Sequence, residues 1–127
     1  MNELRLELAD GKDRFSPLAT LAGKAHWTLD RPPKSVEVRL YWRTEGKGIE
    51  DVETVSAVTF DRPEIREVRD FRFPLPAGPC SFTGHLVSLR WGLELVALPQ
   101  KEAARVEFAL GPEGRTLVLH KSDSGAP

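Results

Sequence analysis

The fold of this chain is decided by residues 71–95, which read FRFPLPAGPCSFTGHLVSLRWGLEL. Phe71, Phe73 and Leu75 occupy alternate positions, as expected for a strand with one buried face. A similar alternation returns in residues 87–95, where apolar side chains fill every second position. The prolines and glycines between these two runs interrupt a strand ladder. The stretch therefore predicts two buried strands joined by a proline-containing crossover.

The same alternation with a period of two runs along most of the chain. It predicts about seven or eight strands, which cover residues 4–8, 21–29, 36–42, 52–60, 71–75, 87–95, 103–110 and 116–120. Strands that are about half polar need one solvated face, which favours antiparallel pairing. The predicted fold class is therefore all-β, an antiparallel two-sheet β-sandwich with little or no helix. In residues 52–60 either face could be buried, so the pattern leaves that strand's orientation open.

Size and composition limit the classes of protein that this chain can belong to. A length of 127 residues suits a single β-sandwich domain, expected over residues 1–120 and followed by a flexible, polar tail over 121–127. A net charge of −1 argues against bulk attraction to nucleic acid. We expect no integral membrane segment, because no apolar run approaches the roughly 20 residues of a membrane span. The single cysteine and the alternating charges at the start favour a cytoplasmic location.

Residues 73–95 carry an ordered set of features that resembles the amino-terminal domain of arrestins. These features are Leu75-Pro76, Pro79, Ser81-Phe82, Gly84 and Arg90-Trp91. The segments 23–29 and 36–42 are similar to that family's early pair of strands. The resemblance implies a single-domain, bacterial-type arrestin-like sandwich, related to the immunoglobulin-like class, that acts as a scaffold. Arrestins pair two sandwiches in tandem and usually have Tyr where Trp91 stands, and the resemblance implies neither a phosphate site nor catalysis.

One outward-facing set of side chains is a candidate partner-binding face, because Arg and Tyr are common at protein interfaces. Its members are Arg39, Tyr41, Arg43, Arg72 and Arg90. Such a face would suit an acidic segment of a partner protein. The alternative is cross-strand pairing of these arginines with Glu37, Glu94 and Glu107, each pair contributing at most about 1 kcal/mol.

No catalytic, cofactor-binding or metal-ligating constellation is predicted. His26, His85 and His120 are scattered without ligand spacing, and Cys80 has no base placed beside it by the sequence. The acidic stretch over residues 45–53 fits no known calcium loop. The tryptophans fall on inward-facing rows, where a sandwich core accounts for them. We therefore expect no enzyme activity and no cofactor.

The function predicted from the sequence is a non-enzymatic protein–protein interaction or scaffold module. Its partner is a protein of unknown identity, bound through an open sheet edge or through the arginine-rich face. A homodimer through a sheet edge is one form of this hypothesis. The alternative is a small-ligand or carbohydrate-binding sandwich, in which Tyr41 and Phe82 would be the exposed aromatic side chains.

Overall fold

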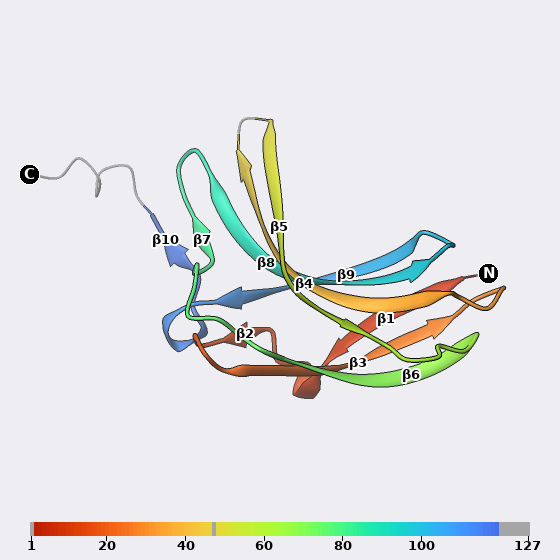
Figure 1. Cartoon of the computed structure of the whole chain (residues 1–127). Helices are drawn as coiled ribbons and strands as arrows, with labels where there is room; N and C mark the ends of the chain where they lie inside the picture. Colours follow the sequence, from red (N-terminus) through yellow and green to blue (C-terminus); the bar gives the residue numbers. More distant parts are fainter. Residues whose placement is uncertain (1, 47, 120–127) are drawn as a thin grey trace, which may run out of the picture.

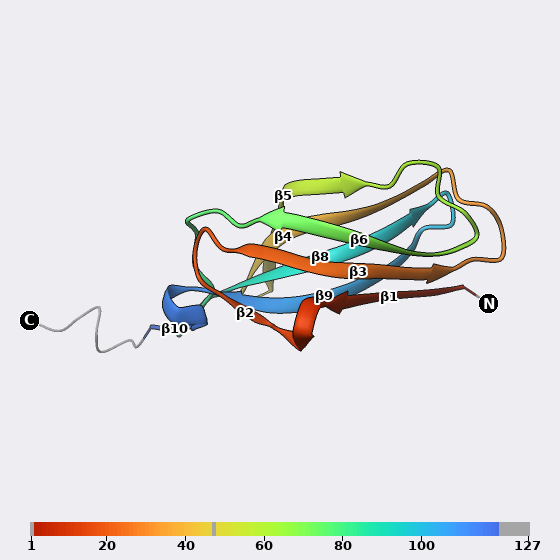
Figure 2. The same cartoon turned by 90° about the horizontal axis from the view of Figure 1, so that it is seen from below.

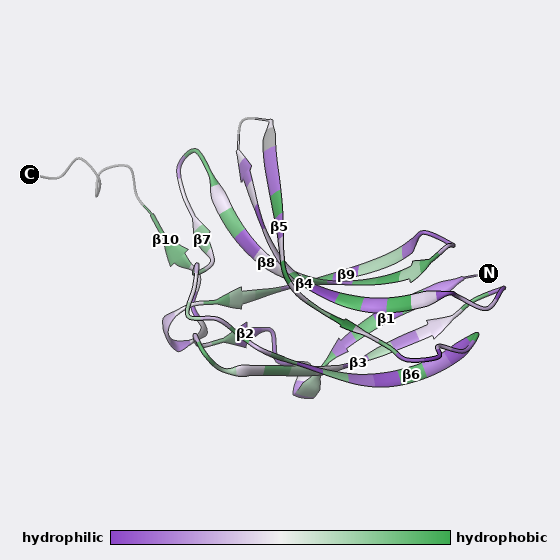
Figure 3. Ribbon diagram, in the orientation of Figure 1, coloured by the Kyte–Doolittle hydropathy of each residue, from purple (hydrophilic) through white to green (hydrophobic). Residues whose placement is uncertain are grey.

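The chain forms two stacked β-sheets, as seen in a computed structural model that describes residues 2–46 and 48–119 (Figures 1 and 2). The predicted all-β sandwich is confirmed. The predicted tail over 121–127 and His120 at the end of the last expected strand lie outside the described residues. Hydrophilic and hydrophobic residues alternate along the strands of both sheets (Figure 3), which gives each sheet one apolar face.

The smaller sheet consists of three antiparallel strands in the order β1, β3, β6. These are β1 (Glu3–Leu8), β3 (Thr20–Thr28) and β6 (Arg66–Pro74). The pairing runs without a register shift from Thr20 opposite Pro74 to Thr28 opposite Arg66. In this register the even-numbered residues of β3 and β6 point to solvent. Lys24, His26 and Arg72 therefore share the outer side of the sheet.

The larger sheet is built around β8, which has β4 on one side and β7 and β9 on the other. Its long strands are β4 (Ser35–Gly46), β5 (Ile49–Thr59), β8 (Ser88–Leu98) and β9 (Glu102–Leu110). Its two-residue strands are β2 (Arg14–Phe15), β7 (Phe82–Thr83) and β10 (Leu117–Val118). Among the described residues this makes ten strands rather than seven or eight, and the β2–β9 and β7–β10 pairs are parallel. Two 3-10 turns, η1 (Ala9–Gly11) and η2 (Pro112–Gly114), complete the chain.

The core lies between the two sheets and draws on both of them. Its largest fully buried side chains are Trp91, Phe73, Leu21, Leu40, Leu93, Leu95, Leu110, Val36 and Val38. Trp27 and Trp91 are buried as predicted, whereas Trp42 is only partly buried. Val87 was predicted to face inward, but it precedes β8 and is 41% exposed, because the carbonyl of Val87 closes a turn with the N–H of Gly84.

The crossover in residues 71–95 connects the two sheets, with β6 in the smaller and β8 in the larger. The indole Nε1 of Trp91 donates a hydrogen bond of 2.6 Å to the carbonyl oxygen of Pro79. The buried hydroxyl of Ser81 accepts a 3.0 Å hydrogen bond from the backbone N–H of Leu110. The middle of the crossover is therefore fixed to β8 and to the end of β9, which joins the two layers.

Replacing Ser81 by alanine tests this anchor. Ser81→Ala leaves the N–H of the fully buried Leu110 without its side-chain acceptor, so we expect a loss of about 1–3 kcal/mol in the free energy of unfolding. Urea denaturation measures this loss. The matched control is Ser56→Ala on exposed β5, which we expect to change stability by no more than about 0.5 kcal/mol. Equal effects of the two substitutions would contradict the anchoring role.

Candidate functional site

The candidate face predicted from the sequence is divided between the two sheets. Arg39, Tyr41 and Arg43 lie on the outer side of β4, and Arg90 lies next to Arg43 on β8. Arg72 lies opposite Ala22 on the outer side of the smaller sheet. Including Arg72 in the face was therefore wrong. Alternation shows that a side chain points outward, but it does not show from which of the two sheets.

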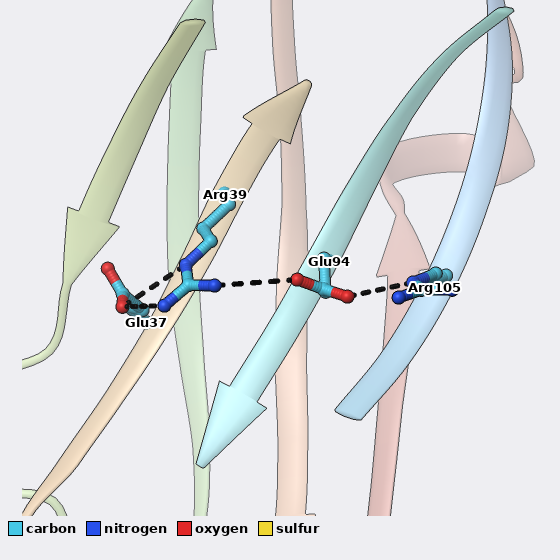
Figure 4. Close-up of polar contacts among 4 residues, drawn as sticks. All are labelled: Glu37, Arg39, Glu94 and Arg105. Atoms are coloured by element: carbon cyan, nitrogen blue, oxygen red, sulfur yellow. Dashed lines mark hydrogen bonds and ion pairs between the residues drawn. The ribbon is translucent and has the colours of Figure 1, made fainter. Parts of the chain in front are cut away.

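Arg39 belongs to a chain of ion pairs that crosses three strands of the larger sheet (Figure 4). It lies 2.7 Å from Glu37 on its own strand and 3.6 Å from Glu94 on β8. Glu94 also accepts a 2.8 Å hydrogen bond from Nε of Arg105 on β9, which raises the pKa of Arg105. Glu94 thus serves two arginines, and neither guanidinium is free to act as an isolated cation.

Arg43 forms a second network on the same face. Its two terminal nitrogens bind Glu45 at 2.8 Å and Glu107 at 2.7 Å. Glu45 also accepts a 3.3 Å hydrogen bond from Arg90. Hydrogen bonds from Arg43 and then from Arg90 hold the pKa of the Glu45 carboxyl below its ordinary value, and the pKa of Arg43 is raised.

These networks balance the charges on the outer face of β4, β8 and β9. Its arginines are Arg39, Arg43, Arg90 and Arg105, and their partners are Glu37, Glu45, Glu94 and Glu107. Partly exposed pairs of this kind each contribute little to stability, up to about 1 kcal/mol. Their main effect is to neutralise one another, so this geometry favours cross-strand pairing over a cationic surface for an acidic segment.

Tyr41 is on the outer row, as its position in the sequence indicates, but it is only 7% exposed. Its ring lies over Gly92 on β8, and a Cβ added at Gly92 would come within 2.6 Å of the Tyr41 hydroxyl oxygen. Gly92 therefore provides the space into which the ring folds. Burial raises the pKa of the Tyr41 hydroxyl, and this effect exceeds the opposing attraction of Arg105. Tyr41 is thus not the exposed aromatic that a carbohydrate site needs.

Tyr41 lines a groove of about 430 Å³ on this face. Glu50, Val52 and Thr54 of β5 line one side of the groove, and Arg105 and Glu107 of β9 line part of the other. Phe82 of β7, the second aromatic of the carbohydrate hypothesis, is half-buried and pairs with the buried, inward-facing Leu89 of β8. Tyr41 and Phe82 therefore face opposite sides of the larger sheet.

The most exposed long strand is β5, and its importance is not evident from the sequence. It pairs only with β4 within residues 2–46 and 48–119, so its other side carries no neighbour there. Val52 is 59% exposed and Val55 is 43% exposed. The sequence left open which face of residues 52–60 is buried, and the structure leaves most of both faces in solvent. The acidic residues near the start of β5 were the feature of the sequence that could have indicated its exposure.

Residues that could hold a metal do not gather in the part of the chain that the structure describes. His26 contacts Arg5 through Nδ1 at 3.2 Å and Glu7 through Nε2 at 3.0 Å, which lowers the pKa of Glu7. Cys80 is a free, half-buried thiol in the crossover. No helix within the described ranges is long and apolar enough to cross a membrane.

Comparisons with known proteins support the fold. The crystal structure of Spo0M, a sporulation control protein from Bacillus subtilis, matches with a TM-score of 0.61 at 15% identity. The match covers 87% of this chain and 49% of that one, so the chain spans about half the length of Spo0M. Spo0M is an arrestin-like β-sandwich, and this chain accordingly has an arrestin-like fold.

Other comparisons add no functional information. A DNA-bound alkylpurine DNA glycosylase, AlkC from Pseudomonas fluorescens, matches with a TM-score of 0.46 at 8% identity, over 87% of this chain and 30% of that one. A likeness of that size carries no argument. No family model matches the chain, and no curated protein matches it.

The titration of Tyr41 tests its burial directly, because it is the sole tyrosine of the sequence. The phenolate absorbance of the folded protein should titrate with a midpoint above the ordinary value of about 10, and that of the urea-unfolded chain near about 10. Because the folded pKa is the higher one, this group's contribution to stability is complete below pH 10. It is lost as the pH rises through the folded pKa.

Arg105→Ala is the informative variant for this titration. It removes a cation that favours the phenolate, so the midpoint of Tyr41 should rise further. A folded midpoint at or below about 10 would show that the hydroxyl is solvated.

Proposed function

We propose that this chain is a non-enzymatic interaction module that binds a protein partner by adding an extended segment of that partner to a sheet edge. The observation that carries the proposal is the long edge strand β5, which is exposed and has a neighbour on one side only among the described residues. An unpaired edge offers a row of N–H and C=O groups, which other chains can use by strand addition.

The other edges are less suitable for a partner strand. The end of β9 is occupied by β2, whose Arg14 and Phe15 pair with Ala109 and Leu110. At the start of β6, the side chain of Arg69 donates to the carbonyl of Asp61, which folds the preceding loop against this edge. β1, the other edge of the smaller sheet, is six residues long and contacts β9, and β10 is only two residues long. β5, with 11 residues, is therefore the edge that we assign to partner binding.

The likeness to Spo0M supports a binding role only by analogy of fold. Spo0M is described as a sporulation control protein. By that analogy, we propose that this chain regulates a partner by contact. From the sequence alone, we also propose that it acts in the cytoplasm and as a single domain. The balanced outer face and the buried Tyr41 speak against the small-ligand or carbohydrate alternative.

Selection of binding peptides tests the proposal without knowledge of the natural partner. We expect a phage-displayed library of random peptides to yield extended sequences that bind the folded chain, with dissociation constants measured by fluorescence anisotropy. Tryptophan fluorescence with a glycan and metabolite panel is the parallel measurement. A failed peptide selection, together with a saturable response to one small molecule, would replace the interaction module by the ligand-binding alternative.

A further inference from the structure

We infer that residues 50–54 of β5 accept a basic segment of a partner protein as an added strand. This inference rests on the proposed function and names its partner class, an extended segment that carries Lys or Arg on both of its faces. Its basis is the juxtaposition, on one open strand edge, of unpaired backbone groups, an exposed apolar side chain and three acidic side chains.

Residues 50–54 form a regularly paired and exposed part of the edge. The β4–β5 ladder shifts register between Leu40 and Tyr41, so that Leu40 faces Ser56, Tyr41 faces Thr54, and Val55 is the extra residue of a bulge. From Thr54 to Ile49 the pairing with β4 is regular. This part of the β4–β5 hairpin extends beyond the smaller sheet, as Figure 1 shows at the top of the view. A strand added before the bulge would therefore meet a regular ladder.

Acidic side chains lie on both faces of this edge. Glu50 shares the outer face with Val52 and Thr54, whereas Asp51 and Glu53 point to the other face. Among the described residues, none of the three acids forms an ion pair within the usual contact distance. Glu50 has only a longer-range attraction to Arg105. These acids differ in this respect from Glu45, Glu94 and Glu107, each of which binds an arginine.

The acids also oppose pairing of β5 with a second copy of itself. When two identical strands pair antiparallel about a two-fold axis, the numbers of any two opposite residues add up to the same value. Opposite residues lie on the same face of the sheet, so this sum is even. Registers centred on residues 50, 51 and 53 place that acid opposite its own copy. The register centred on residue 52 places Asp51 opposite Glu53, and the register centred on residue 54 would have to pair residues 50–53 with the strand beyond the bulge at Val55. Like charges directly opposite are destabilising, so this segment favours a basic partner strand over a homodimer.

The same geometry specifies a probe. An antiparallel strand with the sequence Thr-Lys-Val-Lys-Lys would place a lysine opposite each acid and a valine opposite Val52. A fluorescent peptide that carries this sequence should bind the full chain, and Glu50→Lys/Asp51→Lys/Glu53→Lys should weaken binding by roughly tenfold or more. The matched control is Glu3→Lys/Asp13→Lys/Glu113→Lys. It changes the net charge equally at exposed acids away from β5, and it should change binding by less than about threefold.

Two further measurements test the inference, and the second uses the original chain, so it applies even if the triple variant is destabilised. The charge-swapped peptide Thr-Glu-Val-Glu-Glu should bind the β5 triple variant better than the original chain. Two versions of the lysine-bearing peptide, N-methylated at the odd or at the even positions, form the second measurement. The version methylated at the N–H groups that face β5 should not bind, because it lacks the backbone donors of an added strand.

Three results would overturn the inference. They are equal weakening by both triple variants, undiminished binding of both N-methylated peptides, and protection of residues 50–54 from hydrogen exchange that rises with protein concentration in the absence of peptide. If the basic peptide fails while library peptides of another composition bind the β5 edge, the proposed function stands and only this inference fails.

Discussion

The hydrogen bond from the Trp91 indole to the Pro79 carbonyl is the constraint on which the sandwich depends. Trp91 is fully buried, and the bond satisfies its only polar atom while it fixes the crossover that joins the sheets. Ser81, two residues beyond Pro79, binds both the N–H and the C=O of Leu110. The prolines of the crossover thus carry the chain between the layers, and buried hydrogen bonds determine where it lies.

This placement puts β8 in the middle of the larger sheet and determines the character of the surface. With β8 at the centre, Glu94 lies between Arg39 and Arg105, and ion pairs neutralise the charges on the outer face of β4, β8 and β9. β4 is covered on both edges by β5 and β8, which leaves β5 at the margin. The charge that is not balanced on this sheet is the acidic start of β5. The functional hypothesis therefore moves from a cationic face to an acidic edge.

Alternation was sufficient to predict the sandwich, the inward rows and the crossover, because burial on one face leaves a period of two in the sequence. It could not show that Arg72 and Arg39 lie on different sheets, because an outward position in the pattern does not indicate to which sheet the strand belongs. The burial of Tyr41 depends on the missing side chain of Gly92 on another strand, a relation that appears only with the register. The open edge of β5 was likewise hidden, because a strand's own pattern does not show which neighbours it lacks.

We conclude that β5 is a free edge in the isolated chain, and hydrogen exchange followed by NMR tests this conclusion. If the edge is free, alternate amides of β5 between residues 50 and 54 exchange rapidly at every protein concentration. The other amides there, bonded to β4, and those of β4 and β8 should be protected. Protection of all amides over residues 50–54 in a dilute, monomeric sample would contradict it, because the edge would then already be covered.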